Sequence, residues 1–268
     1  MENDEVELNI MSFNIRYNNP DDGENIWDNR KDMAAEVFKD HDIDVAGLQE
    51  VTKEQLDDLN DRLRDYAYIG VGREDGKFGG ELSPIYYKEE DFTLLDQGTL
   101  WLSETPEIVG SIGWDAALPR IFTWGKFKDN DSGKEFCFIN THFDHRGEMA
   151  RLQSSHLVME KAPQLADGDM PLMITGDFNY TEESEGYKVM TDDHEDISLN
   201  DAMKISEAPF EGDPITINGF DEENAQDKII DFIFVRDGID VLDYDILKIK
   251  EGDVYVSDHY PVISRVLF

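Results

Sequence analysis

The chain has 268 residues, and its 61 acidic against 24 basic side chains give a formal net charge of −37. Because 40% of the residues are hydrophobic and apolar periodicity persists to Phe268, this composition excludes a disordered acidic tail and predicts a folded globule. The length allows one large domain or two small ones, but composition does not break anywhere, so we expect a single domain over residues 1–268.

The hydrophobic pattern predicts strands and helices along the whole chain. We expect strands at 6–14, 43–49, 67–72, 84–88, 92–103, 119–128, 134–142, 171–176, 229–236, 239–249 and 261–267. We expect helices from Asp28 or Asn29 to about Asp40, from the capping box of Thr52 and Gln55 to about Asp65, and over 147–165. The segment 204–228 is predicted as loop, and the acidic run 182–196 as solvated surface.

Several predicted strands are apolar on both faces, as in Phe136-Cys137-Phe138-Ile139. Such strands belong to sheets that are covered on each side. The sequence therefore predicts an α/β fold in which two sheets pack together and helices lie outside them. Cys137 is the only cysteine, which excludes an intramolecular disulfide and a thiolate zinc cluster, and it is expected in the core.

The size and sign of the charge need a physical cause. In multimolar salt the Debye length falls to about 3 Å, which screens the self-repulsion of an acidic surface. We therefore expect a halophilic source, with an ordinary acidic protein as the alternative.

The amino terminus lacks a signal-peptide pattern and no apolar stretch approaches the roughly 20 residues that cross a bilayer. These observations predict a cytoplasmic monomer without a membrane partner, or a secreted one if a signal peptide was removed before the numbering.

Short polar motifs end or interrupt apolar runs at six places. They are Asn14 in Met-Ser-Phe-Asn-Ile-Arg, Glu50 in Leu-Gln-Glu, His142 in Asn-Thr-His-Phe-Asp-His-Arg, Asp177 with Asn179 in Thr-Gly-Asp-Phe-Asn, Asp231 in Ile-Ile-Asp-Phe-Ile-Phe-Val, and Asp258 with His259 in Ser-Asp-His-Tyr-Pro-Val. A hard metal ion acting on a phosphate ester needs oxygen ligands and a cation or proton near the leaving oxygen. The motifs therefore predict a metal-dependent phosphoesterase.

Two motifs are candidates for binding the metal ion and for activating the attacking water. The strand period of two places Asp177 and Asn179 on one side, where one could activate water and the other hold the phosphate; an Asx turn is the alternative. Glu50 at the rim of a sheet suits Mg²⁺, which takes one or two protein carboxylates and completes its shell with water and phosphate oxygens. The alternative for Glu50 is an acidic residue at a helix start.

The remaining motifs carry histidines and cations. Asp231 is costly among apolar neighbours unless it is paired, so we pair it with His259 as the carboxylate that orients the imidazole. His142 lies close in sequence to Arg146, a candidate bidentate phosphate contact in a chain that is poor in cations. Arg73 is a weaker candidate for the same task.

Together these motifs resemble the endonuclease/exonuclease/phosphatase superfamily, which includes exonuclease III-type apurinic endonucleases, deoxyribonuclease I, inositol polyphosphate 5-phosphatases, sphingomyelinases and poly(A) deadenylases. The Asn-Thr-His and Ser-Asp-His patterns are most similar to prokaryotic members related to the deadenylase branch. The resemblance implies a four-layer α/β/β/α sandwich with two central mixed sheets. It departs from the apurinic endonucleases, which carry a Tyr motif in the region of His142, and so speaks against cleavage at apurinic sites.

The resemblance also implies the role of each site residue. Glu50 would be the main Mg²⁺ ligand, with Mn²⁺ as a substitute ion and Asn14 beside it, and Asp258 would be a carboxylate near the first metal or at a second. Asp177 would orient or deprotonate the attacking water, and Asn179 would hold the phosphate. His259, oriented by Asp231, would stabilise the charge of the transition state. His142 would contact the scissile phosphate, assisted by Arg146.

The acidic surface bears on the substrate. A nuclease normally presents a basic surface to the phosphate backbone, and this chain has no basic stretch. We therefore expect a short single strand, a nucleotide or a small phosphorylated metabolite before long double-stranded DNA. The alternative from another class is a binding module that keeps the fold without catalysis.

Overall fold

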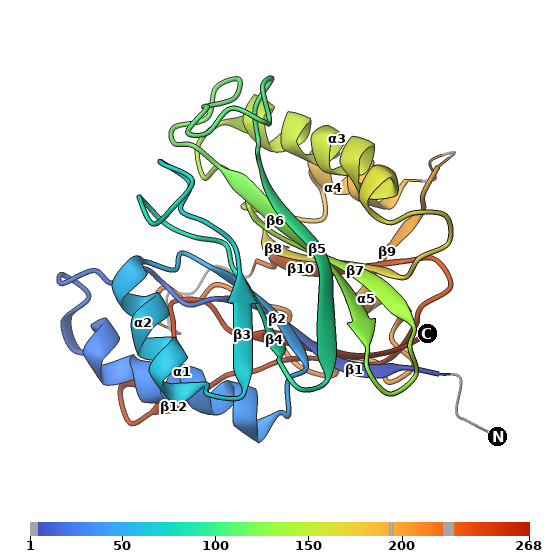
Figure 1. Ribbon diagram of the computed structural model, residues 1–268. Coiled ribbons are helices and arrows are strands. Elements are labelled where there is room, and N and C mark those ends of the chain that lie inside the picture. The colour runs from blue at the N-terminus through green and yellow to red at the C-terminus, as the bar shows by residue number, and fades with distance from the viewer. Residues whose placement is uncertain (1–4, 193, 195, 222–227) are drawn as a thin grey trace.

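The computed structural model describes residues 5–192, 194, 196–221 and 228–268. Two six-stranded sheets pack face to face, and helices cover the outer face of each sheet (Figure 1). The predicted four-layer α/β/β/α sandwich is thus confirmed. Within the described ranges, no helix combines the length and apolar character needed to cross a membrane.

The first sheet carries the amino-terminal strands and the last strand. Its strand order is β11 (Asp240–Ile246), β14 (Val262–Leu267), β1 (Glu7–Asn14), β2 (Val45–Gln49), β4 (Ile85–Lys88) and β3 (Tyr66–Ile69). Helices α1 (Trp27–Asp40) and α2 (Lys53–Arg62) share an apolar core with this sheet. Thr52 and Gln55 form the predicted capping box at the start of α2.

The second sheet is built from the middle of the chain. Its strand order is β5 (Phe92–Trp101), β6 (Ile121–Asp129), β7 (Glu135–His142), β8 (Leu172–Asp177), β10 (Asp231–Arg236) and β9 (Leu199–Asp201). Helices α3 (Glu148–Leu165) and α4 (Glu185–Thr191) share the apolar core on its outer face, and this core includes the fully buried Cys137. Short elements complete the fold: the 3₁₀ turn Gly23–Asn25, α5 (Ala202–Ile205), β12 (Lys250–Glu251) and β13 (Val254–Tyr255).

Each sheet contains one parallel pair of strands near its centre. In the first sheet β1 pairs parallel with β2, and in the second β7 pairs parallel with β8; the other neighbours are antiparallel. Helix α1 connects the first pair and α3 the second. Since the carboxyl ends of parallel strands meet at one edge, the polar motifs that follow these strands gather at one end of the sandwich.

A buried polar bridge fixes the two sheets to each other near that end. The Asn140 side chain, on β7, donates from Nδ2 to the carbonyl oxygens of Leu48 and Pro84 at 2.7 and 3.0 Å, and its Oδ1 accepts from Gln49 Nε2 at 2.7 Å. Gly47 lies directly against this side chain, where a Cβ would collide with the Asn140 carboxamide. A glycine is therefore required for the sheets to approach this closely.

The structure differs from the predicted elements in a few places. Helix α2 ends at Arg62 and not near residue 65, and β5 ends at Trp101. Helix α4 was predicted as solvated surface, but Ser184 accepts from the Tyr187 backbone N–H and so caps a short helix. Most of segment 204–228 follows the predicted loop, except that α5 extends into it and residues 222–227 lie outside the described chain.

Candidate active site

Asn14 and Glu50 bring the first sheet into the site. The Asn14 side chain at the end of β1 donates from Nδ2 to Glu50 Oε1 at 3.1 Å and to Asp177 Oδ2 at 2.9 Å. Glu50 adopts a left-handed backbone conformation, with φ of 63°, directly after β2. Its Oε2 accepts from the Tyr17 backbone N–H at 3.0 Å. Strain of this kind in a non-glycine residue is held by surrounding contacts and is typical of functional sites.

Asp177 and Asn179 come from the end of β8. Asp177 Oδ1 accepts from the Asn179 backbone N–H at 3.0 Å, which is the Asx turn considered as an alternative. The other oxygen, Oδ2, faces Asn14 and lies 3.4 Å from His142 Nε2 and 3.9 Å from His259 Nε2. The Asx turn therefore fixes Oδ1 and leaves Oδ2 facing the site. Asp177 can thus be both a turn residue and a catalytic carboxylate.

His259 and Asp231 form a buried pair. Asp231 lies opposite Asp177 in the antiparallel pairing of β10 with β8, and its Oδ2 is 2.8 Å from His259 Nδ1. Burial alone would lower the pKa of His259, but the carboxylates of Asp231 and Asp177 raise it well above its usual value. His259 is therefore held as an imidazolium whose Nε2 faces Asp177.

His142 is the second buried histidine of the site. Burial, and then the nearby Arg120 and Arg73, lower its pKa well below the usual value, so its imidazole is neutral. Its Nε2 lies 3.1 Å from Asn179 Nδ2 and accepts from that amide. The two histidines thus stand in opposite charge states a few ångströms from the same carboxylate.

Among the residues that the structure describes, two clusters of side chains offer ligand atoms that lie within 4.8 Å of one another. One contains Glu50, His142 and Asp177, and the other contains Asp177, Asp231 and His259. Burial, and then the charge of Asp231, raise the pKa of Asp177 to about 7. Carboxylate oxygens that are crowded and only partly neutralised are suited to a hard divalent cation, so the donor set fits such an ion. Asp258 belongs to neither cluster, and its Oδ2 lies 3.5 Å from Arg16 Nη1.

These side chains surround a cavity of about 430 Å³. Its described lining residues are Arg16, Tyr17, Glu50, Glu81, Leu118, Arg120, His142, His145, Asp177, Asn179, Ile217, Ile230, Asp258 and His259. Asn14 and Asp231 lie just behind this lining, where they hold Glu50, Asp177 and His259 in place. The structure thus brings the motifs from all six places in the chain to one cavity.

The cations at the cavity differ from those that the sequence suggested. Arg73 is buried and its guanidinium binds both oxygens of Glu81, at 2.7 and 3.0 Å, so it supports the cavity wall from behind. The Arg146 side chain is exposed and lies outside the lining. Arg16 and Arg120 line the cavity instead.

Sequence reasoning missed Arg16, Arg120 and Glu81. Arg16 lies two residues after Asn14 and closes the motif Met-Ser-Phe-Asn-Ile-Arg, so its place in the sequence could have indicated that it lies near the site. Arg120 directly precedes β6, and its Nη2 lies 3.0 Å from His145 Nδ1. Glu81 follows the glycine-rich segment 72–80, whose path depends on contacts with distant loops, so it carried no local signal.

Comparison with known proteins identifies the family. The model of the "Endonuclease/Exonuclease/phosphatase family" matches residues 11–259, a range that contains all six motifs. The chain belongs to this family. The resemblance drawn from the motifs is thereby confirmed.

Several proteins are similar over nearly the whole chain. A crystal structure of an endonuclease/exonuclease/phosphatase from Bacteroides vulgatus is 40% identical, with a TM-score of 0.92, and the match covers 97% of this chain and 98% of that one. A mannosyl-6-phosphatase from Bacteroides thetaiotaomicron is 37% identical, with a TM-score of 0.89 and coverage of 97% and 100%. An uncharacterized protein of Acanthamoeba polyphaga mimivirus is 27% identical over 88% of this chain and 91% of its own length.

Membership of the endonuclease/exonuclease/phosphatase family establishes the type of chemistry. Enzymes of this family hydrolyse phosphoester bonds and depend on divalent metal ions, and the buried carboxylates and histidines found here fit that chemistry. The chain is therefore a phosphoester hydrolase with a candidate metal site.

Proposed function

We propose that this protein is a Mg²⁺-dependent phosphatase that acts on a small phosphate monoester. The observation that carries the proposal is the catalytic cavity of about 430 Å³, which is lined by the carboxylates of Glu50 and Asp177 and by the cations Arg16 and Arg120. A cavity of this size accommodates a phosphate group with part of a small alcohol. The similarity to a mannosyl-6-phosphatase supports a sugar phosphate as the substrate class.

The metal ion would be held by Glu50, with the Asn14 carboxamide beside it and Asp258 at the edge of the site, while Asp177 Oδ2 stays available to the attacking water. When bound, Mg²⁺, or Mn²⁺ in its place, supplies a Lewis acid that polarises a phosphate oxygen and makes bound water more acidic. Oxygen ligands of this kind favour Mg²⁺ and Mn²⁺ over softer ions.

The protein side chains would carry the remaining steps of hydrolysis. Asp177 takes a proton from the attacking water through Oδ2, the carboxylate oxygen that faces the cavity. The water oxygen bonds to phosphorus while the P–O bond to the alcohol breaks. The alcohol oxygen takes up a proton from solvent and Asp177 releases its proton to solvent, which gives inorganic phosphate and the free alcohol. Asn179 and the neutral His142 contact the phosphate, and the imidazolium of His259 stabilises the charge that develops on it.

Charge at the cavity favours a small substrate over a nucleic acid. The cavity rim carries Glu81 and Asp258 beside Arg16 and Arg120, so the next phosphates of a polyanion would meet carboxylates as well as cations. At low ionic strength, the net charge of −37 also makes the chain as a whole repel a long polyanion.

A substrate panel tests this proposal. We expect Mg²⁺-dependent release of phosphate from mannose 6-phosphate and p-nitrophenyl phosphate, and kcat/KM at least about tenfold lower for bis-p-nitrophenyl phosphate and for a short single-stranded oligonucleotide. The control is Asp177→Ala, which removes the general base and so should abolish turnover above background. Faster cleavage of the diester or the oligonucleotide would contradict the monoester proposal, and a wild type no faster than Asp177→Ala would favour a binding module.

The acidic surface leads to a separate proposal of adaptation to high salt. Exposed carboxylates repel one another less as the Debye length shrinks, so the folded state should gain stability with added KCl. We expect the Tm to fall by several degrees between 2 M and 0.1 M KCl, measured by circular dichroism. A sucrose solution of equal osmolality serves as the control for solvent exclusion. A Tm that does not change with KCl would remove the argument for a halophilic protein.

A further inference from the structure

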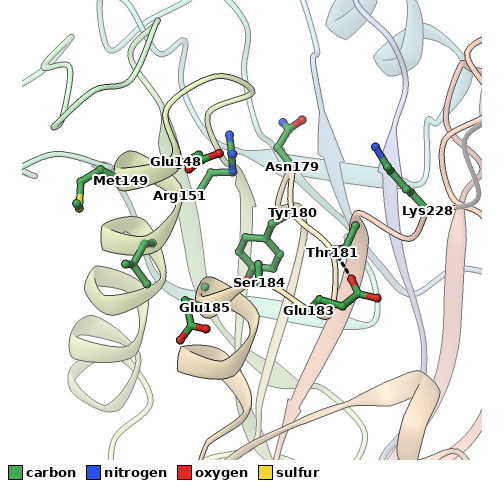
Figure 2. A pocket seen from close by; sticks show the side chains of 12 residues that line it. Glu148, Met149, Arg151, Asn179, Tyr180, Thr181, Glu183, Ser184, Glu185 and Lys228 are labelled. Atoms are coloured by element: carbon green, nitrogen blue, oxygen red, sulfur yellow. Dashed lines mark hydrogen bonds between the residues drawn. The ribbon is translucent and has the colours of Figure 1, made fainter.

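A second cavity, of about 680 Å³, adjoins the catalytic one. It lies between α3 and the segment that leads from Asn179 into α4 (Figure 2). Asn179 lines both cavities, and Ile230 of the catalytic cavity is two residues from Lys228 of the second. A ligand bound by its phosphate in the first cavity can therefore continue past Asn179 into the second.

The lining of this cavity mixes hydrogen-bonding groups of both kinds. Carboxylates come from Glu148, Glu183 and Glu185, cations from Arg151 and Lys228, hydroxyls from Thr181 and Ser184, and apolar surface from Met149, Leu152 and Tyr180. Figure 2 shows Arg151 on α3 and Lys228 on opposite sides of Asn179. Glu185 is paired with Lys188 at 2.6 Å, so carboxylates and cations around this cavity are equal in number and favour a ligand without net charge. Sugar hydroxyls suit such a lining, because they can donate to carboxylates and accept from a guanidinium group.

Parts of this lining are held in place before any ligand binds. Tyr180 is only 6% exposed and packs against Phe143, Phe178 and Phe232. Thr181 Oγ1 donates to Glu183 Oε2 at 2.5 Å, and Ser184 caps α4. A wall that is already ordered loses little conformational entropy on binding, as in preformed ligand sites.

Both cavities are supported by the turn that follows β7. Asn179 Nδ2 donates to the carbonyl oxygen of Phe143 at 3.1 Å, and Arg151 Nη1 donates to that of Asp144 at 3.0 Å. Although burial acts against it, the backbone N–H groups of Gly147 and Arg146 lower the pKa of Asp144 to about 2, so its charge keeps this turn closed. The second cavity therefore has a fixed position relative to the proposed phosphate site.

We propose that the second cavity is a subsite for a neutral, hydroxyl-rich extension of the leaving alcohol, such as a second sugar unit. This inference rests on the proposed function and deepens it, because the preferred substrate becomes a phosphorylated oligosaccharide and not a free sugar phosphate. The phosphate is cleaved in the first cavity, and the added sugar contacts the α3 side of the second. The preference should therefore depend on residues that do not touch the phosphate.

The test compares mannose 6-phosphate with an α-linked mannobiose that carries the same 6-phosphate. We expect the wild type to prefer the disaccharide by about tenfold in kcat/KM, the gain from one or two additional hydrogen bonds. Glu148→Gln, which weakens an acceptor, and Leu152→Trp, which adds bulk at a residue that lines the cavity, should reduce this preference to about twofold or less and leave mannose 6-phosphate hydrolysis unchanged. The matched control is Glu160→Gln, an exposed carboxylate on α3 outside the cavity.

A binding measurement separates this inference from the catalytic proposal. Calorimetric titration with unphosphorylated mannobiose should show binding to the wild type and to Glu160→Gln, and loss of binding in Leu152→Trp. Equal kcat/KM for the two phosphates together with no binding of mannobiose would overturn the subsite, even in an active phosphatase. Binding of mannobiose by a protein that hydrolyses no phosphate monoester would support the subsite and overturn the phosphatase.

Discussion

Replacement of His259 by Ala is expected to lower kcat by about 10²–10³-fold, with a smaller change in KM. The reason is the charge state of this residue, since the buried carboxylates of Asp231 and Asp177 keep His259 as an imidazolium in the catalytic cavity. A cation at this position interacts more strongly with the transition state, in which charge accumulates on the phosphate and the leaving oxygen, than with bound substrate. Phosphate release at saturating substrate and Mg²⁺ measures the effect.

The control for this variant must separate chemistry from folding. His259→Ala leaves the Asp231 carboxylate buried without its partner, which is costly, so the Tm of each variant has to be measured beside kcat. His156→Ala is the matched substitution, because His156 is exposed on α3 and lines neither cavity. A folded His259→Ala protein with nearly wild-type kcat would refute the assigned role.

Replacement of Glu50 by Gln is expected to raise the Mg²⁺ concentration for half-maximal activity by about tenfold or more. Glu50 is held by hydrogen bonds from Asn14 Nδ2 and the Tyr17 backbone N–H, so its carboxylate is presented at a fixed position next to Asp177. Gln keeps the shape and one oxygen but removes the charge that attracts a divalent ion. The expected result is therefore weakened metal activation in a protein that still folds.

The architecture could be predicted largely from apolar runs and their polar ends. The runs before Asn14, Glu50, His142 and Asp177 are strands, and the parallel pairing of β1 with β2 and of β7 with β8 brings their ends together. These signals are local, because a strand and the residue that follows it are adjacent in sequence. Helix α4 escaped prediction because its seven residues lie within an acidic run and bury few side chains.

The parts of the site that could not be predicted depend on contacts between loops. Arg73 was predicted to bind phosphate, but its guanidinium binds Glu81 instead. Arg73 and Glu81 come together only when segment 72–80 folds back on itself, which the sequence does not reveal. Arg120 reaches the cavity after the long connection between β5 and β6, which gives no periodic signal. The second cavity likewise arises from the packing of α3 against α4, so no motif in the sequence marks it.

The proposed hydrolysis depends on a divalent ion that is bound by residues of both sheets. The most direct measurement is the anomalous scattering of Mn²⁺ in crystals of the wild type and of Glu50→Gln. We predict a strong peak about 2.2 Å from a Glu50 carboxylate oxygen, near Asp177, and its loss in the variant. A peak confined to the exposed carboxylates around α4, or one that is unchanged in Glu50→Gln, would contradict the proposed metal centre.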